Sequence, residues 1–375
     1  MNAPAPRVAP SVLPRLAMRG VLAASALLLL AGCGTAYLAQ AVGGHLDLLQ
    51  RARPVPDWIA DPDTPPALRE RLLLSQRMRE FAVRELALPD SASYRRFAQL
   101  ERPAAVWNVV AAPELSLTLK TWCFPVAGCV GYRGYFDRAQ AEAFAATLQR
   151  GQGLETRVYP VPAYSTLGRT DWLGGDPLLS TFIHWPEAEL ARLLFHEMAH
   201  QVVYVGDDTA FNEGYATAVE RLGLRRWLAG ADDALRLQEA RSQARRRDFL
   251  ALTRQARDDL DALYRSRLAP DEQRARKAQR LQQLRDEHAR LKAQAWAGFS
   301  GYDAWFDQVN NAALAVQAAY DDLAPAFEQL FEREGADFPA FHAAVRRLAA
   351  LPRAERRSVL AQVSAPGRPA RPVPP

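Results

Sequence analysis

The sequence predicts a mixed α+β fold in which a small sheet is packed among helices. Three observations support this prediction. Segments rich in Val, Tyr, Trp and Phe between residues 104 and 185 are typical of strands. Long helical patterns precede and follow them. With 375 residues, 49% hydrophobic and 24% charged, the composition is that of a globular protein and excludes collagen-like, wholly disordered and polytopic membrane proteins.

The N-terminus has the layout of a secretory signal. Residues 1–20 carry three arginines and no acidic residue, and residues 21–31 form an apolar run too short to cross a bilayer comfortably. The run ends in Leu-Ala-Gly-Cys33, which resembles the lipobox of bacterial lipoproteins. This resemblance implies a signal peptide at 1–32 and a lipidated Cys33 that anchors the chain to the membrane. An uncleaved anchor helix is the alternative.

Charge and sorting signals indicate where the protein works. The residue after the cysteine, Gly34, favours the outer membrane in the lipoprotein sorting rule, so we expect the chain in the bacterial cell envelope, facing the periplasm.

Of the formal net charge of +5, three positive charges (Arg7, Arg15 and Arg19) precede Cys33. Nucleic-acid-binding proteins usually keep their excess positive charge in the folded part, so we predict no nucleic-acid partner.

The secondary structure is expected in the following order. Two helices, at 36–52 and 65–87, are separated by a Pro/Asp-rich segment that no helix could cross. A helix at 139–149 lies among strands at 104–111, 126–136, 156–161 and 181–185. Cys123 and Cys129 can close a small disulfide loop in an oxidising compartment, or else are buried free thiols.

Composition divides the chain into regions. Residues 33–231 are expected to hold the N-terminal helices and the catalytic core, and 232–297 a charged helical hairpin interrupted at Pro270. Residues 298–352 return to amphipathic helices that pack on the core, and 353–375 form a Pro-rich disordered tail. The charges of the hairpin indicate a solvated face, and binding of a protein partner is the alternative.

The segment His196-Glu197-Met198-Ala199-His200 carries the chemistry. On a helix, positions four apart share a face, so both imidazoles can reach one ion with Glu197 beside it. A Zn²⁺ ion held by two histidines and a carboxylate keeps a position for water and lowers the pKa of that water, whose proton Glu197 can take. The alternative is a helix with two unrelated histidines and a salt-bridged glutamate.

The next helix, expected after the capping residues Asp207 and Asp208, offers two possible third ligands. Glu213 follows His200 by 13 positions, and Glu220 follows it by 20. They share a helix face but stand about 10.5 Å apart along the axis, so both cannot bind one ion. The spacing alone leaves both open.

The histidine segment, followed by Asn212-Glu213-Gly214-Tyr215-Ala216-Thr217, resembles the gluzincin metallopeptidases. The similarity is greatest to aminopeptidase N-like enzymes, in which an Asn-Glu-Gly-Phe-Ala-Thr segment supplies the glutamate ligand. The resemblance implies a zincin-like catalytic core with one Zn²⁺ ion, in which a small sheet lies beside the motif helix and the glutamate helix. It also implies individual roles: His196, His200 and Glu213 as ligands, Glu197 as the general base, and Asn212 and Thr217 as residues that orient the ligands. The connection between the motifs is shorter here, so Glu220 stays the alternative ligand.

The whole arrangement is more similar still to a family of bacterial lipoproteins assigned as aminopeptidases. The similarity covers most of residues 33–350 and rests on strings such as Val106–Pro113 and Tyr132–Phe136. It implies a peptide substrate. The Gly-x-Met-Glu-Asn segment that holds the substrate amine in aminopeptidase N-like enzymes is missing, and Glu114, Asp171 and Asp176 are conceivable substitutes.

Three tyrosines are candidates for stabilising the oxyanion that forms during hydrolysis. They are Tyr164, Tyr302 and Tyr320, each with aromatic packing as the alternative role.

The leader, the histidine motif and the resemblance together predict a membrane-anchored, zinc-dependent peptidase of the aminopeptidase type. A peptide deformylase-like enzyme with Cys129 as a ligand, and a non-catalytic envelope scaffold with a structural or degenerate metal site, are the competing hypotheses.

Overall fold

The computed structural model describes residue 37 and residues 39–124, 128–163, 174–206, 208–318 and 323–364. The chain divides into two units, 1–47 and 48–375. The described residues of the first unit are helical. Among the described residues, no helix has the length and apolarity needed to span a membrane. Cys33 lies outside the described residues.

The second unit begins with a small sheet beside a long helix. β1 (Arg53–Pro54) pairs antiparallel with β2 (Arg96–Ala98), which pairs parallel with β8 (Leu178–Leu179). Between β1 and β2 lie α2 (Val55–Ala60) and α3 (Pro66–Glu85). The prolines at 65 and 66 stop the preceding segment and start α3, because proline is accommodated at the first turn of a helix.

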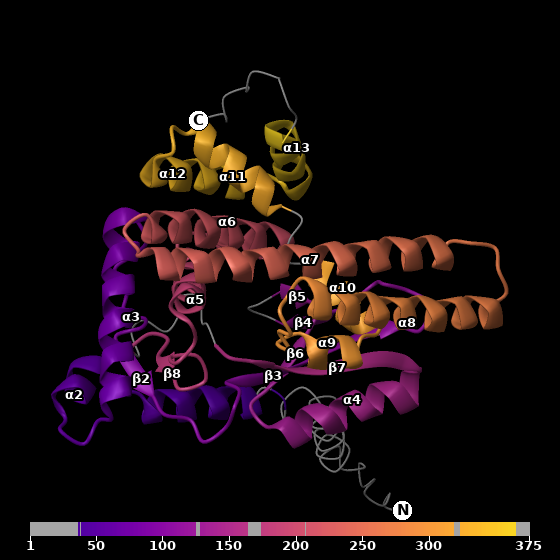
Figure 1. The fold of residues 1–375 in the computed structure, drawn as a ribbon, viewed down its shortest axis with the longest axis horizontal. Coiled ribbons are helices and arrows are strands. Elements are labelled where there is room, and N and C mark those ends of the chain that lie inside the picture. The colour runs from indigo at the N-terminus through magenta and orange to yellow at the C-terminus, as the bar shows by residue number, and fades with distance from the viewer. Residues whose placement is uncertain are drawn as a thin grey trace, which may run out of the picture. The chain divides into compact units, whose positions relative to one another are not determined.

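A second, antiparallel sheet has the order β6-β3-β7. Its centre is β3 (Val106–Pro113), which pairs along its whole length with β7 (Leu154–Val161) and more briefly with β6 (Arg133–Tyr135). α4 (Arg138–Gln152) packs against this sheet and leads into β7 through Gly153, whose φ of +62° suits glycine (Figure 1). The hairpin of β4 (Trp122–Phe124) and β5 (Gly128–Val130) is closed by a Cys123–Cys129 disulfide.

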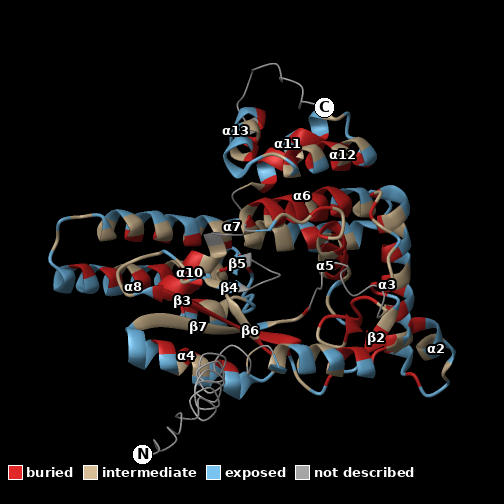
Figure 2. Cartoon of the chain, turned by 180° about the vertical axis from the view of Figure 1, so that it is seen from behind, coloured by how far each residue is buried: buried red, intermediate tan, exposed pale blue. Residues whose placement is uncertain are grey.

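Four helices follow the sheets. α5 (Glu187–Ala199) packs against α6 (Thr209–Leu228), and α7 (Asp233–Tyr264) pairs with α8 (Pro270–Gln294) as an antiparallel hairpin. α8 is bound to the sheet by the buried Lys277. Its ammonium contacts the carboxylate of Glu155 in β7 and donates to the carbonyl of Glu114, just after β3, over 2.7 Å. Figure 2 shows that α6 is largely buried and that α7 and α8 are more exposed toward the turn that joins them.

The C-terminal helices cover other elements of the second unit. They are α9 (Asp303–Asp307), α10 (Asn311–Ala318), α11 (Ala324–Arg333), α12 (Phe338–Ala349) and α13 (Arg353–Ser364). α10 lies against β3 and β7, and α11 lies against α6.

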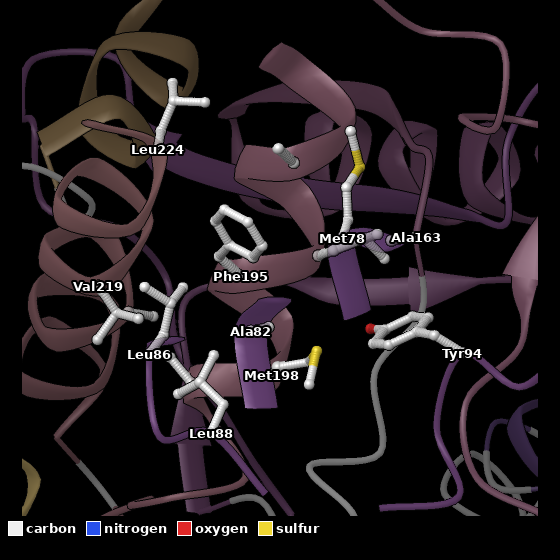
Figure 3. Packing of buried hydrophobic residues seen from close by; sticks show 14 of the residues in the cluster. Met78, Ala82, Leu86, Leu88, Tyr94, Ala163, Phe195, Met198, Val219 and Leu224 are labelled. Atoms are coloured by element: carbon white, nitrogen blue, oxygen red, sulfur yellow. The ribbon is translucent and has the colours of Figure 1, made fainter. Parts of the chain in front are cut away.

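The main core gathers where α3, α5 and α6 meet. Phe195 and Met198 of α5 point into this core, as does Met78 of α3, and all three are at most 1% exposed (Figure 3). Fully burying one such side chain contributes about 1.5–3 kcal/mol. The helix that carries the histidine motif is therefore held firmly on its apolar side.

Three expectations need correction. The segment 181–185, expected as a strand, is a turn in which Ile183 N–H donates to the Leu179 carbonyl, because its buried side chains fold back onto the core. The strand expected at 126–136 is interrupted between β5 and β6. The tail expected from residue 353 begins with α13, because its buried Leu360 and Val363 give it an apolar face.

Candidate metal centre

α5 presents two imidazoles at one point. Pro186 precedes the helix, and Glu187 and Glu189 in the first turn favour it electrostatically. The helix ends at Ala199, with His200 as its C-terminal cap. One turn apart, His196 and His200 bring their Nε2 atoms within 3.2 Å of each other. Two nitrogens that face each other so closely suit a shared cation.

α6 brings a carboxylate to the same point. The Asp208 side chain caps the helix by accepting from Phe211 N–H. Glu213, in the second turn, places Oε2 3.3 Å from His196 Nε2 and 3.9 Å from His200 Nε2. Ligand atoms of the three side chains all lie within 4.8 Å of one another. The structure thus brings His196, His200 and Glu213 together, as the sequence analysis expected.

Glu220 contacts the other side of the same ring. Its Oε2 lies 3.1 Å from His196 Nδ1, so it is placed to fix the ring and not to share the point of convergence. Burial raises the pKa of Glu220, but His196 and the nearby Arg246 and Arg192 outweigh burial and lower it. Glu220 therefore stays ionised although it is 6% exposed.

The electrostatics of the site differ between the two imidazoles. Burial alone lowers the pKa of His196, but hydrogen bonds to Glu213 and Glu220 outweigh it and raise the pKa well above its ordinary value. Burial lowers the pKa of His200 to about 4, so this imidazole is neutral and free to act as a ligand. Two imidazoles and a carboxylate in a partly buried site fit the donor set of a divalent cation such as Zn²⁺.

Glu197 follows His196 directly in α5. Burial raises the pKa of Tyr94 and of Tyr132. The charge of Glu197 acts in the same direction on Tyr94, and the charges of Glu213 and, more weakly, Glu197 do so on Tyr132. The phenol of Tyr132 is therefore near both the expected base and the expected third ligand. Tyr94 has a φ of +63°, an uncommon conformation for a tyrosine that the surrounding core holds in place.

Asn212 and Thr217, expected to orient the ligands, are both buried in α6. The Asn212 side-chain amide both accepts from Val205 N–H and donates to the Val205 carbonyl, over 2.8 Å each. It thereby ties the loop between α5 and α6 to the first turn of α6. Thr217 is buried within α6, 4% exposed.

Other expected residues lie elsewhere or are not described. Tyr164, Tyr320 and Asp171 lie outside the described residues. Tyr302 stacks on Phe249 in the core of the hairpin, and Glu114 pairs with Arg274 of α8, so both interactions are with the hairpin. Cys129 is bonded to Cys123 and does not belong to the cluster of possible ligands.

Three residues near the site are not indicated as functional by the sequence. Arg192 precedes His196 by four positions in an otherwise apolar stretch, a spacing that puts both on one face and could have revealed it. Glu239 contacts Arg192 from α7, but nothing distinguishes it in its charge-rich segment. Tyr132 belongs to the string Tyr132–Phe136, which indicates the family and gives no sign of a role at the site.

Fold and site together define an α+β protein with a candidate metal centre built by two successive helices. A family model with the description "Putative aminopeptidase" matches residues 36–360, and the chain belongs to this family. No curated protein and no solved structure matches the chain.

Proposed function

We propose that this member of the aminopeptidase family is a zinc-dependent peptidase that removes residues from the N-termini of peptides. The observation that carries the proposal is the convergence of His196, His200 and Glu213 within 4.8 Å, with Glu197 next to the first imidazole in the sequence. The family description supports the peptidase activity and its polarity.

The residues of the chain would divide the work as follows. His196 Nε2, His200 Nε2 and a Glu213 oxygen would hold the cation, which supplies a Lewis acid that polarises the peptide carbonyl and acidifies water. Glu197 would take a proton from the attacking water and pass it to the departing amine. Glu220, on His196 Nδ1, would keep the ring in the orientation that directs Nε2 to the cation.

The decisive experiment compares the wild type with Glu197→Gln. We expect both proteins to bind one equivalent of Zn²⁺, measured by elemental mass spectrometry. The variant should lose about 100- to 10,000-fold in kcat/KM because only the proton acceptor is gone. Glu142→Gln on the exposed side of α4 is the matched control and should cleave like the wild type. Unchanged cleavage by Glu197→Gln would falsify the proposed role.

The substrate polarity is tested with the same protein. A peptide library with free N-termini and the same library with acetylated N-termini are digested in parallel and sequenced by mass spectrometry. We expect loss of single N-terminal residues from the free peptides alone. Internal cleavage of the acetylated peptides would instead identify an endopeptidase.

The proposed attachment to the cell envelope follows from the leader sequence. Cys33 would become the lipidated first residue of the mature protein, with the body facing the periplasm and the outer membrane as the anchoring site. Metabolic labelling with a radioactive fatty acid should mark the wild-type chain and not Cys33→Ser, and peptide cleavage should be the same in both. An unlabelled wild-type chain, or equal labelling of both proteins, would contradict lipid anchoring.

A further inference from the structure

A chain of buried charges runs outward from the candidate metal centre. Arg192 of α5 donates from Nη1 to Glu220 Oε1 over 3.3 Å and from Nη2 to Glu239 Oε1. Glu220 in turn contacts His196. The side chains of Arg192, Glu220 and Glu239 are 8%, 8% and 3% exposed, so all three charges are withdrawn from water.

Helix α7 of the charged hairpin supplies the outer end of this chain. Besides Glu239, Arg246 of α7 lies 3.5 Å from Glu220, and Ser242 donates to Glu189 of α5 over 3.0 Å. Figure 1 shows α7 running alongside α6 and past α5, and α7 also contacts α5 directly. One face of the hairpin therefore touches the back of the metal centre, although the hairpin looks in the sequence like a solvated arm.

Packing energy does not account for this arrangement. Removing charged groups from water is costly, and apolar residues of similar volume would stabilise a helix contact at least as well. A buried guanidinium between two carboxylates instead fixes the orientation of both carboxylates, because its N–H groups lie in one plane and donate in fixed directions. The carboxylate held in this way is the one on His196 Nδ1.

We propose that Arg192 and Glu239 are positioning residues of the metal centre, and that α7 is its outer wall. Glu239 fixes the guanidinium of Arg192, Arg192 fixes the Glu220 carboxylate, and Glu220 holds the ring of His196 so that Nε2 faces the cation. His200 has no such support, because its Nδ1 finds no hydrogen-bond partner within the described ranges. The inference rests on the metal site of the proposed function.

The first test measures Zn²⁺ affinity in the full mature chain by competition with a chromophoric chelator. Glu239→Gln keeps the shape of the side chain but removes its charge, and we expect the Zn²⁺ dissociation constant to rise about tenfold. The matched control is Glu155→Gln, which weakens the contact of Lys277 at another point of the same hairpin. It should lower the melting temperature of the metal-free protein but leave Zn²⁺ affinity within about twofold of the wild type.

The second test asks whether Glu239 acts through Glu220. Glu220→Gln alone should weaken Zn²⁺ binding, and the double variant Glu220→Gln/Glu239→Gln should bind no more weakly than Glu220→Gln, because the relay is already cut. Arg192→Lys keeps the charge without the fork and should behave like Glu239→Gln. Circular dichroism and melting of each metal-free protein show that the variants are folded.

Several results would overturn the inference. Wild-type affinity in a folded Glu239→Gln variant, equal weakening by Glu155→Gln, or additive losses in the double variant would each exclude a relay. If Glu239→Gln does not fold, Zn²⁺ affinity is measured in Arg192→Lys instead. Wild-type affinity in that variant would likewise exclude the relay. A wild-type chain that binds no Zn²⁺ refutes the proposed function as well, whereas Zn²⁺ binding without peptide cleavage refutes only the proposed activity.

Discussion

Glu213 and Glu220, two turns apart on α6, contact opposite nitrogens of one imidazole. Glu213 Oε2 is 3.3 Å from His196 Nε2, and Glu220 Oε2 is 3.1 Å from Nδ1. A metal ion and an outer carboxylate commonly occupy these two positions of a ligating histidine. The two glutamates, which the sequence offered as rivals for one role, therefore occupy two different positions.

This relationship predicts different outcomes for the two carboxylates. Glu213→Ala removes a ligand and should abolish stoichiometric Zn²⁺ binding at micromolar concentrations. Glu220→Gln removes only the outer partner and should keep a stoichiometry of one while the dissociation constant rises about 10- to 100-fold. Isothermal titration calorimetry measures both quantities.

The control for these variants is Glu328→Gln. Glu328 of α11 also pairs with arginines of α6, Arg221 and Arg225, but on the partly exposed side of the helix. It should bind Zn²⁺ like the wild type. Full loss of binding in Glu220→Gln, together with retained binding in Glu213→Ala, would exchange the roles of the two glutamates.

A second prediction concerns the close approach of α6 and the start of α11. A Cβ atom at Gly214 would lie 2.7 Å from Leu323 Cβ and 3.3 Å from its carbonyl carbon. Because part of the clash is with backbone, Gly214→Ala should lower the free energy of unfolding by about 1–3 kcal/mol. This loss exceeds the stabilisation expected from the higher helix propensity of alanine.

The same substitution in open space provides the control. Gly151, near the end of α4, has nothing within 4 Å of a Cβ atom, so Gly151→Ala should raise the free energy of unfolding by about 0.5–1 kcal/mol. Urea unfolding followed by circular dichroism measures both changes. Equal effects of the two substitutions would show that α6 and α11 do not meet as described.

The disulfide gives a third prediction. Cys123→Ser/Cys129→Ser opens the loop of the β4–β5 hairpin and should reduce the free energy of unfolding by about 2 kcal/mol. Zn²⁺ stoichiometry and affinity should not change, because neither sulfur belongs to the cluster of possible ligands. Loss of metal from this variant would revive the hypothesis of a cysteine ligand, as in peptide deformylases. A protein treated only with reductant should match the serine variant in stability.

Local patterns predicted the part of the site that local geometry determines. The spacing of His196 and His200 places both on one helix face wherever the chain is helical. The assignment of Glu213 needed family resemblance, because both glutamates share a face of α6. The contact of Arg192 with Glu239 joins residues 47 positions apart on different helices, and it depends on how the hairpin docks. No single-helix pattern contains that information.

The errors in secondary structure have a similar origin. The stretch from Thr181 to Trp185 has the β-branched and aromatic residues of a strand, but its backbone turns ahead of Pro186, and the aromatic Phe182 and the aliphatic Ile183 are simply buried. The start of α13 escaped notice because the proline-rich end dominates the composition of the tail. Its docking also depends on Arg356, which pairs with the buried Asp208 over 3.0 Å.

The last prediction concerns His342, a buried histidine away from the metal centre. Leu86 offers only a carbonyl oxygen, so His342 Nε2 must donate to it, and Nδ1 accepts from the Tyr215 hydroxyl; both contacts are 2.8 Å long. Burial lowers the pKa of His342 to about 4 and outweighs the hydrogen bond to the Leu86 carbonyl, which raises it; the weaker effects of Arg346 and Asp337 oppose each other. The neutral ring is thus the form that the fold requires.

The pH dependence follows from the sign of this shift. Because the pKa is lower in the folded state than its ordinary value of about 6.5, the unfolded chain takes up a proton first as the pH falls. The contribution of the neutral His342 to stability should therefore be intact above about pH 6.5, and about 3 kcal/mol should be lost as the pH falls from about 6.5 to about 4. In His342→Gln, a neutral side chain with a donor and an acceptor, urea unfolding of the metal-free protein should show that much less acid destabilisation. Acid destabilisation of His342→Gln equal to that of the wild type would contradict the assignment to the buried ring.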